Sequence, residues 1–430
     1  MAKTQMEVAR SGGITEEIRE VAKLEEVPED WLAQRVARGT VVVFKPPKPG
    51  SRPVAVGEGL RVKVNVNVGT SLDLCNPNLE LEKARLAVKY GADTVMDLST
   101  AEPIAAVRRL LIEHLEVPVG TVPIYEAAIR AVERGGSVVD MTVDDMFNAI
   151  EAHAKDGVSF MTIHAGVTKE VVEGLKLHPR LGGIVSRGGS FLAAWILHNN
   201  QENPLYANYD YLLELAKEYD FAISLGDGMR PGCQADAQDW AQLSEIMVLG
   251  SLVKRARKAG VQVIVEGPGH MPLDQIEANV KVTKKVTEGA PLYTLGPLVT
   301  DVAPGYDHIA LAIGGAVAAA AGVDFLCAVY KSEHLGLPLP EDVKESVIAT
   351  RIAAHAADIV RLGEKALRWD NEISKARARL DWEAQFKLAM DPEEARRIHE
   401  RVPSKSGACS VCGKYCVYLV LARSLKRREE

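Results

Sequence analysis

Short runs rich in β-branched residues alternate with longer helical stretches along most of this chain, and this pattern limits the possible folds more than any other feature. The runs span residues 62–68, 94–98, 117–122, 159–163, 183–185, 221–225, 261–265, 292–295 and 325–329. Strands separated by helices pair in parallel, and this number of units predicts an α/β fold closed as a (β/α)8 TIM-type barrel. Nine runs compete for eight strands, so one of them is not a strand, and the pattern is weakest at 292–295.

Regions without this alternation flank the barrel on both sides. Residues between Thr15 and Gly39 predict two short amphipathic helices, and the proline-rich stretch 45–53 predicts a linker. Beyond residue 363 the strand pattern stops and the chain predicts helices up to a cluster of cysteines. The predicted domains are therefore a small helical N-terminal region (1–59), the barrel (60–363) and a helical C-terminal domain that carries a CxxCxxxC motif (364–430).

Charge and hydropathy narrow the classes of function. The net charge of −7 gives no electrostatic support for binding nucleic acid. No segment approaches the roughly eighteen consecutive apolar residues of a membrane span, and the first residues lack an apolar signal core. We therefore expect a cytoplasmic enzyme with no membrane or nucleic-acid partner, whose six cysteines stay reduced and free to bind metal.

Polar residues follow almost every predicted strand. They lie at 67–70, 96–97, 125, 164, 186–190, 227–230, 266–270 and 333–334. A buried parallel strand does not require such residues, whereas barrel enzymes assemble their active sites at the carboxyl ends of the strands. We therefore expect these residues to form one catalytic mouth.

Three cysteines, Cys409, Cys412 and Cys416, lie within eight residues near the C-terminus. A structural zinc site and a simple electron-transfer cluster both use four protein ligands. Three cysteines around a four-iron cluster leave one iron open to a small chelating molecule, which is the arrangement of radical S-adenosylmethionine (SAM) chemistry. The spacing alone is equally compatible with a zinc knuckle completed by His399 or another histidine.

The residues at the mouth suggest separate tasks, each with an ordinary structural alternative. The turn 186–190 offers closely spaced backbone N–H groups to a phosphate, with Arg230 as a charged donor, although such turns are often only tight turns. His270 and His334, each near an acidic residue, are candidates for a metal site with open positions, or are structural histidines. Asp227 and Glu266 are candidates for proton transfer or for binding an amine or ribose, or are caps and ion-pair partners.

Seven strings together resemble the phosphomethylpyrimidine synthase family, the radical SAM enzymes that make the pyrimidine of thiamin. They are NVNVGTS (65–71), MDLST (96–100), GTVPIY (120–125), GIVSRGGS (183–190), SLGDGMRPG (224–232), EGPGH (266–270) and TDVAPGYDH (300–308). The resemblance runs in order from about residue 60 to the C-terminus. It implies a lyase that converts 5-aminoimidazole ribotide into 4-amino-5-hydroxymethyl-2-methylpyrimidine phosphate, with release of formate and carbon monoxide.

The resemblance also implies cofactors and partners. Cys409, Cys412 and Cys416 would hold a 4Fe-4S cluster beside SAM, and His270 and His334 would hold zinc or another divalent metal. The expected partners are a second copy, whose barrel the cluster domain reaches in a homodimer, and an electron donor such as flavodoxin or ferredoxin. Of the implied site residues, we take Asp227, Glu266 and Tyr293 as catalytic. The implied substrate-binding set is Asn67, Met96, Tyr125, His164, Ser186, Arg187, Gly188, Asp227, Arg230, Glu266 and Tyr293.

Three details differ from the family's pattern. The cysteines are separated by two and then three residues, one fewer than is familiar in the family. Residues 101–102 are Ala-Glu where a glycine pair is common, and residues 328–331 replace a Tyr-Val-Thr-Pro-like run. Two alternatives therefore remain open. One is a 5-hydroxybenzimidazole synthase, which uses the same ribotide for the lower ligand of anaerobic cobamides, and the other is an inactive metal-binding regulatory paralogue.

Overall fold

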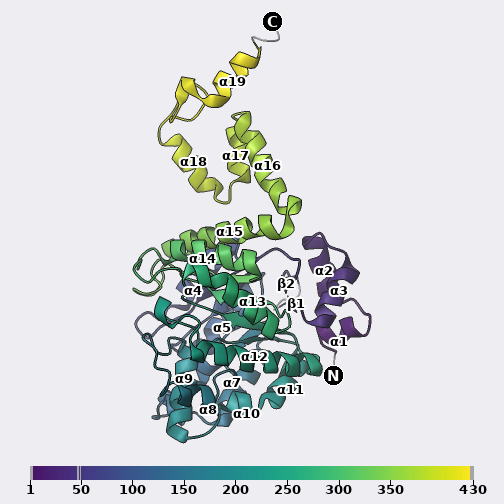
Figure 1. Cartoon of the computed structure of the whole chain (residues 1–430), viewed down its shortest axis with the longest axis vertical. Helices are drawn as coiled ribbons and strands as arrows, with labels where there is room; N and C mark the ends of the chain where they lie inside the picture. The colour runs from purple at the N-terminus through teal and green to yellow at the C-terminus, as the bar shows by residue number, and fades with distance from the viewer. Residues whose placement is uncertain (1–2, 46–47, 49, 427–430) are drawn as a thin grey trace. The chain divides into compact units, whose positions relative to one another are not determined.

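A computed structural model describes residues 3–45, 48 and 50–426 of the chain. The chain divides into two compact units, Met1–Asp358 and Ile359–Glu430, which are described separately below (Figure 1). No helix among the described residues combines the length and the apolar character that crossing a membrane requires.

The first unit is built on a closed barrel of eight parallel strands, in the order β10-β3-β4-β5-β6-β7-β8-β9. The strands are β3 (Lys63–Val68), β4 (Thr94–Asp97), β5 (Val119–Thr121), β6 (Phe160–Ile163), β7 (Ala222–Leu225), β8 (Val263–Gly267), β9 (Leu292–Leu295) and β10 (Phe325–Cys327). The barrel closes where β10 pairs with β3, with Phe325 opposite Lys63. The predicted TIM-type barrel is therefore confirmed.

Helices follow the strands and cover the outside of the barrel. They are α4 (Pro77–Lys89), α5 (Ile104–His114), α6 (Pro123–Glu133), α7 (Val143–Lys155), α8 (Lys169–Gly174), α9 (Arg187–Asn199), α10 (Pro204–Ala207), α11 (Tyr209–Tyr219), α12 (Trp240–Ala259), α13 (Ile276–Val286), α14 (Asp307–Ala321) and α15 (Pro340–Leu362). Their buried faces and the strands form one continuous hydrophobic core. Because the strands run in parallel, all the loops that leave their carboxyl ends meet at one mouth.

The prediction of which run is not a strand was wrong. Residues 292–295, where the pattern is weakest, form β9, and residues 183–185 are the run that does not pair. Tyr293 and Thr294 of this strand are both buried, and the Tyr293 hydroxyl accepts from Nδ2 of Asn65 inside the barrel. Residues 183–185 instead lead directly into the N-cap of α9 at Ser186. A three-residue apolar run is too short for its pattern to distinguish a strand from a loop.

The N-terminal region closes the opposite end of the barrel. The predicted helices are present as α2 (Glu16–Leu24) and α3 (Glu29–Arg38), and Gly39 ends α3 in the left-handed conformation. Helix α1 (Gln5–Arg10) and an antiparallel hairpin of β1 (Val41–Phe44) and β2 (Val54–Gly57) were not predicted. The predicted linker is the turn of this hairpin, and its residues 46, 47 and 49 lie outside the described residues.

The hairpin is anchored to the barrel floor by aromatic stacking. Phe44 is fully buried, and its ring centroid lies 4.5 Å from that of Phe160 and 5.8 Å from that of Phe325. Gln262 pairs with the backbone of Val43 in both directions, at 2.7 and 3.0 Å. Phe44 therefore fills the centre of the barrel floor.

The second unit is helical. It contains α16 (Glu364–Ala378), α17 (Trp382–Leu388), α18 (Pro392–Glu400) and, after the cysteines, η4 (Gly413–Tyr415) and α19 (Val417–Lys426). The Trp382 ring stacks on His399 with centroids 4.0 Å apart, and its Nε1 donates to the carbonyl of Gly407 at 2.9 Å. This contact fastens the segment that leads into the cysteines onto α17 and α18.

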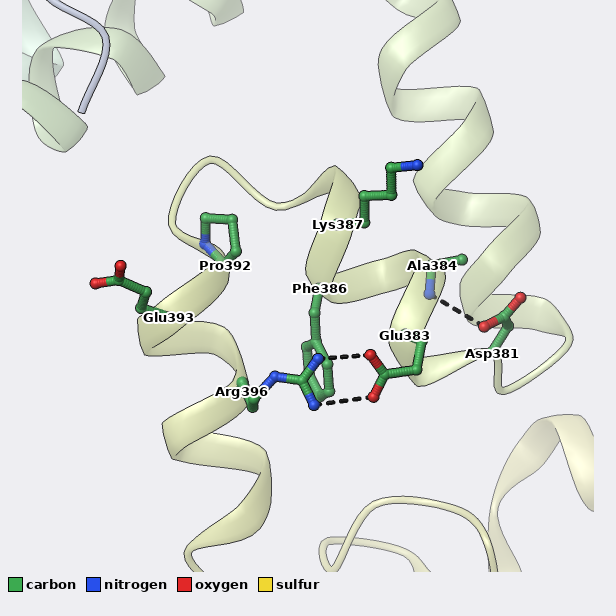
Figure 2. Close-up of a pocket in the computed structure, with 8 residues that line it drawn as sticks. All are labelled: Asp381, Glu383, Ala384, Phe386, Lys387, Pro392, Glu393 and Arg396. Carbon is green, nitrogen blue, oxygen red and sulfur yellow. Dashed lines mark hydrogen bonds and ion pairs between the residues drawn. The ribbon is translucent and has the colours of Figure 1, made fainter. Parts of the chain in front are cut away.

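An open hollow of about 560 Å³ lies between α17 and α18 (Figure 2). Arg396 crosses it, donating to both carboxylate oxygens of Glu383 at 2.9 and 2.5 Å and lying over the Phe386 ring. Because Arg396 and Glu383 neutralise each other near the surface, this hollow has the character of a helix–helix junction. The polar groups that could bind a substrate converge in the barrel instead.

Candidate active site at the barrel mouth

A cavity of about 270 Å³ lies at the carboxyl ends of the strands. Its walls are Asn67, Met96, Leu98, Val122, Tyr125, Thr162, His164, Val185, Arg187, Asp227, Arg230, Glu266, Tyr293, Leu295, Cys327 and Glu333. Nine of the predicted substrate-binding residues are among them, and Ser186 and Gly188 lie directly behind the wall. The structure therefore brings together the polar strand ends that the sequence marked separately.

One side of the cavity is organised by Asn65, a buried residue of β3 that the sequence analysis did not single out. Its Nδ2 lies 2.9 Å from Oδ1 of Asn67 and 2.8 Å from the hydroxyl of Tyr293, and its Oδ1 accepts from Thr94 at 2.7 Å. Burial holds the pKa of Tyr293 well above its ordinary value, so the phenol keeps its proton. Asn65 thereby fixes the orientation of both Asn67 and Tyr293.

The cavity also carries two carboxyl groups, Asp227 after β7 and Glu266 on β8, where Glu266 is the cross-strand neighbour of Tyr293. Glu266 accepts hydrogen bonds from Thr162 at 2.7 Å and from Ser224 at 2.6 Å, yet burial raises its pKa. Burial also raises the pKa of Asp227 well above the usual range, although Arg230 opposes this shift. Oδ2 of Asp227 is buried and has no hydrogen-bond partner among the described residues. Carboxyl groups of this kind retain protons more strongly than ordinary ones and suit proton transfer.

The predicted phosphate turn forms the N-terminus of α9. Ser186 caps this helix by accepting from the backbone N–H of Gly189 at 3.2 Å. A Cβ atom at Gly188 would lie 2.3 Å from the ring of His164, and one at Gly189 would lie 2.4 Å from the carbonyl of Gly228. The two glycines thus allow the helix N-terminus to approach the turn after β7, which carries Arg230.

Two arginines line the same part of the cavity. Arg230 is largely buried and donates to Oδ1 of Asp227 at 3.1 Å. Arg187 is exposed and lies over the Tyr125 ring, with its guanidinium carbon 5.0 Å from the ring centroid. Together with the N-terminus of α9, these cations make this side suitable for a phosphate.

His164 contributes to the site as a neutral ring. Burial, together with repulsion from Arg230, lowers its pKa to about 3, and its Nε2 lies 3.2 Å from the hydroxyl of Ser186. Since the ring carries no charge at neutral pH, it can accept or donate one hydrogen bond but cannot serve as a cationic anchor. Its structural task is to support Ser186 beneath the phosphate turn.

The two predicted metal-binding histidines lie side by side, with ring centroids 5.1 Å apart. Nδ1 of His270 lies 2.8 Å from Asp301, and Nδ1 of His334 lies 3.0 Å from Asp307. A histidine that donates from Nδ1 to a carboxylate presents the lone pair of Nε2 to a metal, as metal-binding histidines commonly do. The pair therefore fits a divalent metal that takes its remaining ligands from elsewhere.

The cysteine segment lies in the second unit, in a short turn. The N–H of Gly413 donates to the carbonyl of Cys409 at 3.1 Å, and Cys416 directly precedes α19. All three cysteines are free thiols, and the suggested alternative ligand His399 is stacked on Trp382. Within the described residues, no three His, Cys, Asp or Glu side chains gather as a ready-made metal site. The donor chemistry of three adjacent thiols fits an iron–sulfur cluster.

Several residues that shape the site were missed from the sequence. They are Asn65, Thr162, Ser224, Asp301 and Asp307, with Glu245 behind the turn after β7. Asp301 and Asp307 do lie in the string 300–308, which the sequence analysis quoted without giving either residue a task. Glu245 accepts from the N–H of Met229 at 2.8 Å, and burial raises its pKa to about 8.

Comparison with known proteins covers the whole chain. A family model described as Radical SAM ThiC family matches residues 4–423. A phosphomethylpyrimidine synthase of Pyrococcus furiosus is 55% identical over 423 residues, covering 98% of this chain and 98% of its own length. Phosphomethylpyrimidine synthases of Geobacter metallireducens and Methanocaldococcus jannaschii are each 52% identical, covering 100% and 99% of this chain and 99% and 100% of their own lengths. Among solved structures, a Coxiella burnetii dihydropteroate synthase matches with a TM-score of 0.41 and 12% identity, covering 70% of this chain and 94% of its own.

Proposed function

The chain belongs to the radical SAM ThiC family, and from this membership we propose that it makes the thiamin pyrimidine from 5-aminoimidazole ribotide. The proposed product is 4-amino-5-hydroxymethyl-2-methylpyrimidine phosphate, with formate and carbon monoxide released by a carbon–carbon lyase reaction. The observation that carries this proposal is the identity of 52–55% to phosphomethylpyrimidine synthases over nearly the full length of both chains.

Two groups of side chains would hold the cofactors. Cys409, Cys412 and Cys416 would bind a 4Fe-4S cluster, and His270 and His334 would bind zinc or another divalent metal. When bound, the cluster supplies one electron to SAM and so generates the 5′-deoxyadenosyl radical that starts the reaction. The support within this chain is the free state of the three thiols and the orientation of both rings by Asp301 and Asp307.

The cavity residues have separate tasks in this proposal. Arg230 and the N-terminus of α9 hold the phosphate of the ribotide, because they combine a cation with the positive end of a helix. Asn67 orients the imidazole edge, since Asn65 fixes its amide. Asp227 and Glu266, whose pKa values are both raised by burial, lie next to the ligand and are suited to proton transfer. Tyr293 donates from a phenol that stays protonated.

We further propose that the enzyme is a homodimer in which the cysteine segment covers the mouth of the partner's barrel. Apolar side chains are exposed around the cysteines, at Val411, Tyr415 and Val417, and on loops at the mouth, at Val302 and Leu335. Exposed apolar groups of this kind mark interfaces. Light scattering of the purified protein tests this proposal, and a strictly monomeric enzyme with full activity would contradict it.

We propose that an acidic one-electron donor such as flavodoxin or ferredoxin reduces the cluster. Residues 401–426, which surround the cysteines, contain five Lys or Arg and no Asp or Glu. A basic surface attracts an acidic protein and accelerates their encounter at low salt. Reduction that is equally fast at about 0.05 M and about 0.5 M salt, a range over which screening of surface charges increases strongly, would argue against this partner class.

Anaerobic reconstitution with iron and sulfide tests the central proposal. We expect a brown protein that forms 5′-deoxyadenosine from SAM, and mass spectrometry of the product then distinguishes the pyrimidine from 5-hydroxybenzimidazole. Cys412→Ala should abolish deoxyadenosine formation, while the circular dichroism of the barrel stays unchanged because Cys412 lies outside its core. A colourless protein that binds only zinc would support the regulatory alternative, and normal turnover by Cys412→Ala would refute the cysteine assignment.

A further inference from the structure

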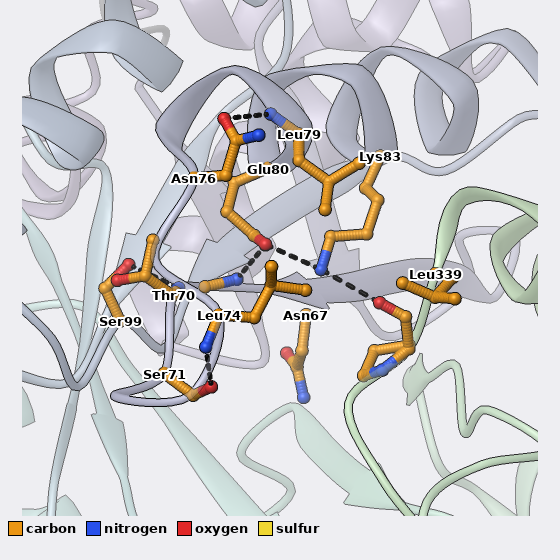
Figure 3. Close-up of polar contacts among 12 residues, drawn as sticks. Asn67, Thr70, Ser71, Leu74, Asn76, Leu79, Glu80, Lys83, Ser99 and Leu339 are labelled. Carbon is orange, nitrogen blue, oxygen red and sulfur yellow. Dashed lines mark hydrogen bonds and ion pairs between the residues drawn. The ribbon is translucent and has the colours of Figure 1, made fainter.

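Next to the mouth, but outside the cavity wall, α4 carries an ion pair that is completely removed from water. Nζ of Lys83 lies 2.8 Å from Oε1 of Glu80, and both side chains are 0% exposed (Figure 3). Glu80 and Lys83 are three residues apart on one helix, a spacing at which such pairs usually lie on the solvent-exposed face. Here the pair lies beneath two loops of the mouth, one from β3 and one from β10.

The Glu80 end of the pair holds the loop that leaves β3. Its Oε2 accepts from the backbone N–H of Gly69 at 2.6 Å, two residues after the cavity residue Asn67. Gly69 has φ +150°, and a Cβ atom there would lie 2.5 Å from the backbone nitrogen of Ser99. Position 69 therefore has no space for a side chain, and Glu80 holds its backbone N–H.

The Lys83 end holds the loop that carries His334. Nζ of Lys83 donates to the carbonyl of Pro338 at 3.1 Å. At the other end of this loop, the hydroxyl of Tyr330 donates to the carbonyl of Asn67 at 2.6 Å. Residues 333–336 between these two points are exposed. The loop is thus tied at both ends to the β3 segment that carries Asn67.

Burying the Glu80–Lys83 pair costs hydration energy, which suggests that the pair positions the two loops rather than stabilising the fold. Two charges removed from water lose hydration that their mutual attraction only partly restores, so an apolar pair of similar size is often as stable. A charged pair differs from an apolar pair in that it can form hydrogen bonds to particular backbone atoms. Here those atoms are the N–H of Gly69 and the carbonyl of Pro338, one on each loop.

We propose that Glu80 and Lys83 are positioning residues that join the metal site to the ribotide site, so that occupation of one improves binding at the other. This inference rests on the proposed function, because it takes Asn67 as a ribotide contact and His334 as a metal ligand. Ribotide that fixes Asn67 also fixes its carbonyl, to which the Tyr330 hydroxyl is bonded. The bond from Lys83 to the carbonyl of Pro338 restrains the opposite end of the loop that carries His334. Binding energy at one site then orders the other, and this coupling acts equally in both directions.

The test is a calorimetric titration of zinc into the cluster-free full-length protein, with and without saturating 5-aminoimidazole ribotide. We expect ribotide to tighten zinc binding in the wild type by at least about fivefold, the lower end of ordinary coupling. We define the zinc ratio as the zinc dissociation constant without ribotide divided by that with ribotide. In the double variant Glu80→Gln/Lys83→Met, called the clamp variant below, this ratio should fall to within about twofold of one. The variant removes the bond to Pro338 but leaves no unpaired buried charge, and the amide introduced by Glu80→Gln can still accept from the N–H of Gly69.

The chain offers a matched control at the closed end of the barrel. Lys63 and Glu25 form another buried pair, with Nζ 2.9 Å from Oε1, far from both loops of the mouth in the fold. Glu25→Gln/Lys63→Met should therefore keep the wild-type zinc ratio. Hydrogen exchange provides a second readout, because ribotide should protect residues 330–338 in the wild type and in this control but not in the clamp variant.

Each outcome has a defined meaning. A clamp variant that keeps both the zinc ratio and the ribotide-dependent protection overturns the inference. A wild type that binds zinc and ribotide independently overturns it as well, while the proposed function stands. A wild type that binds neither ligand removes the proposed site and the inference with it. A ratio lost equally in the control variant refutes a specific role for Glu80 and Lys83.

Discussion

Replacement of Arg230 by methionine tests the part of the site that should bind phosphate. Arg230 is 19% exposed, lines the cavity and donates to Asp227 at 3.1 Å. Methionine retains much of the apolar stem and removes the cation. Asp227 tolerates the loss, because burial already raises its pKa and the carboxyl group takes up a proton instead of remaining as an unpaired charge.

The expected magnitude follows from the bond that the variant loses. A hydrogen bond to a charged group contributes about 1.5–3 kcal/mol, which corresponds to a change in affinity of about 10- to 150-fold. The assay compares binding of 5-aminoimidazole ribotide with that of the riboside, which lacks the phosphate. We expect Arg230→Met to weaken ribotide binding by this factor and to change riboside binding by less than about threefold, since the lost interaction involves only the phosphate.

The comparison of the two ligands makes the result decisive. If Arg230→Met weakened both ligands equally, the arginine would act through the position of Asp227 or through the shape of the cavity. The phosphate would then have to be bound elsewhere. Arg187→Met is a useful second variant, because Arg187 is exposed and stacked on Tyr125, and its loss should have a smaller effect on ribotide binding.

Three further predictions concern residues behind the cavity wall. Asn65→Leu leaves several buried polar partners unpaired and should lower the free energy of unfolding in urea by about 2–3 kcal/mol, so an unchanged midpoint would contradict the network. Asp301→Asn should weaken zinc binding about 10- to 100-fold in competition with a chromogenic chelator, because His270 loses the carboxylate that orients it. Glu245 has its pKa raised from 4.5 to about 8, so the folded state retains a proton that the unfolded state releases, and stability falls as pH rises between these values. Glu245→Gln should remove this fall, of about 1.4 kcal/mol per pH unit at most, and an identical pH profile for both proteins would refute the assignment.

The barrel and most of its mouth could be predicted because both depend on a regular pattern. Strand–helix alternation determines the parallel barrel, and polar residues just after the strands must meet at one end of it. Nine residues flagged in this way line the cavity. The same reasoning failed at residues 183–185, because a short apolar segment that precedes a helix has the composition of a strand, and only the presence of a pairing partner distinguishes them.

The residues that orient the cavity side chains without lining the cavity do not follow the pattern of polar residues directly after the strands. Asn65 points into the barrel two positions before Asn67, where a buried strand residue is expected to be apolar, and its value depends on partners in β4 and β9 that are distant in sequence. Asp301 and Asp307 were part of a recognised string, but the sequence could not show that they orient His270 and His334. Such contacts depend on the pairing of loops from different strands.

The ion pair on α4 shows the same limit most clearly. From sequence, Glu80 and Lys83 look like an ordinary pair on the surface of a helix, which would contribute at most about 0.5 kcal/mol. The structure buries both because the loops after β3 and β10 lie over the start of α4, and these loops are neighbours only because the barrel closes between β10 and β3. Without closure of the barrel this pair would be an ordinary surface ion pair. With closure it contacts the loops of both proposed binding sites. Substitutions at such positions should therefore be interpreted from the loops that they connect, not from the helix that carries them.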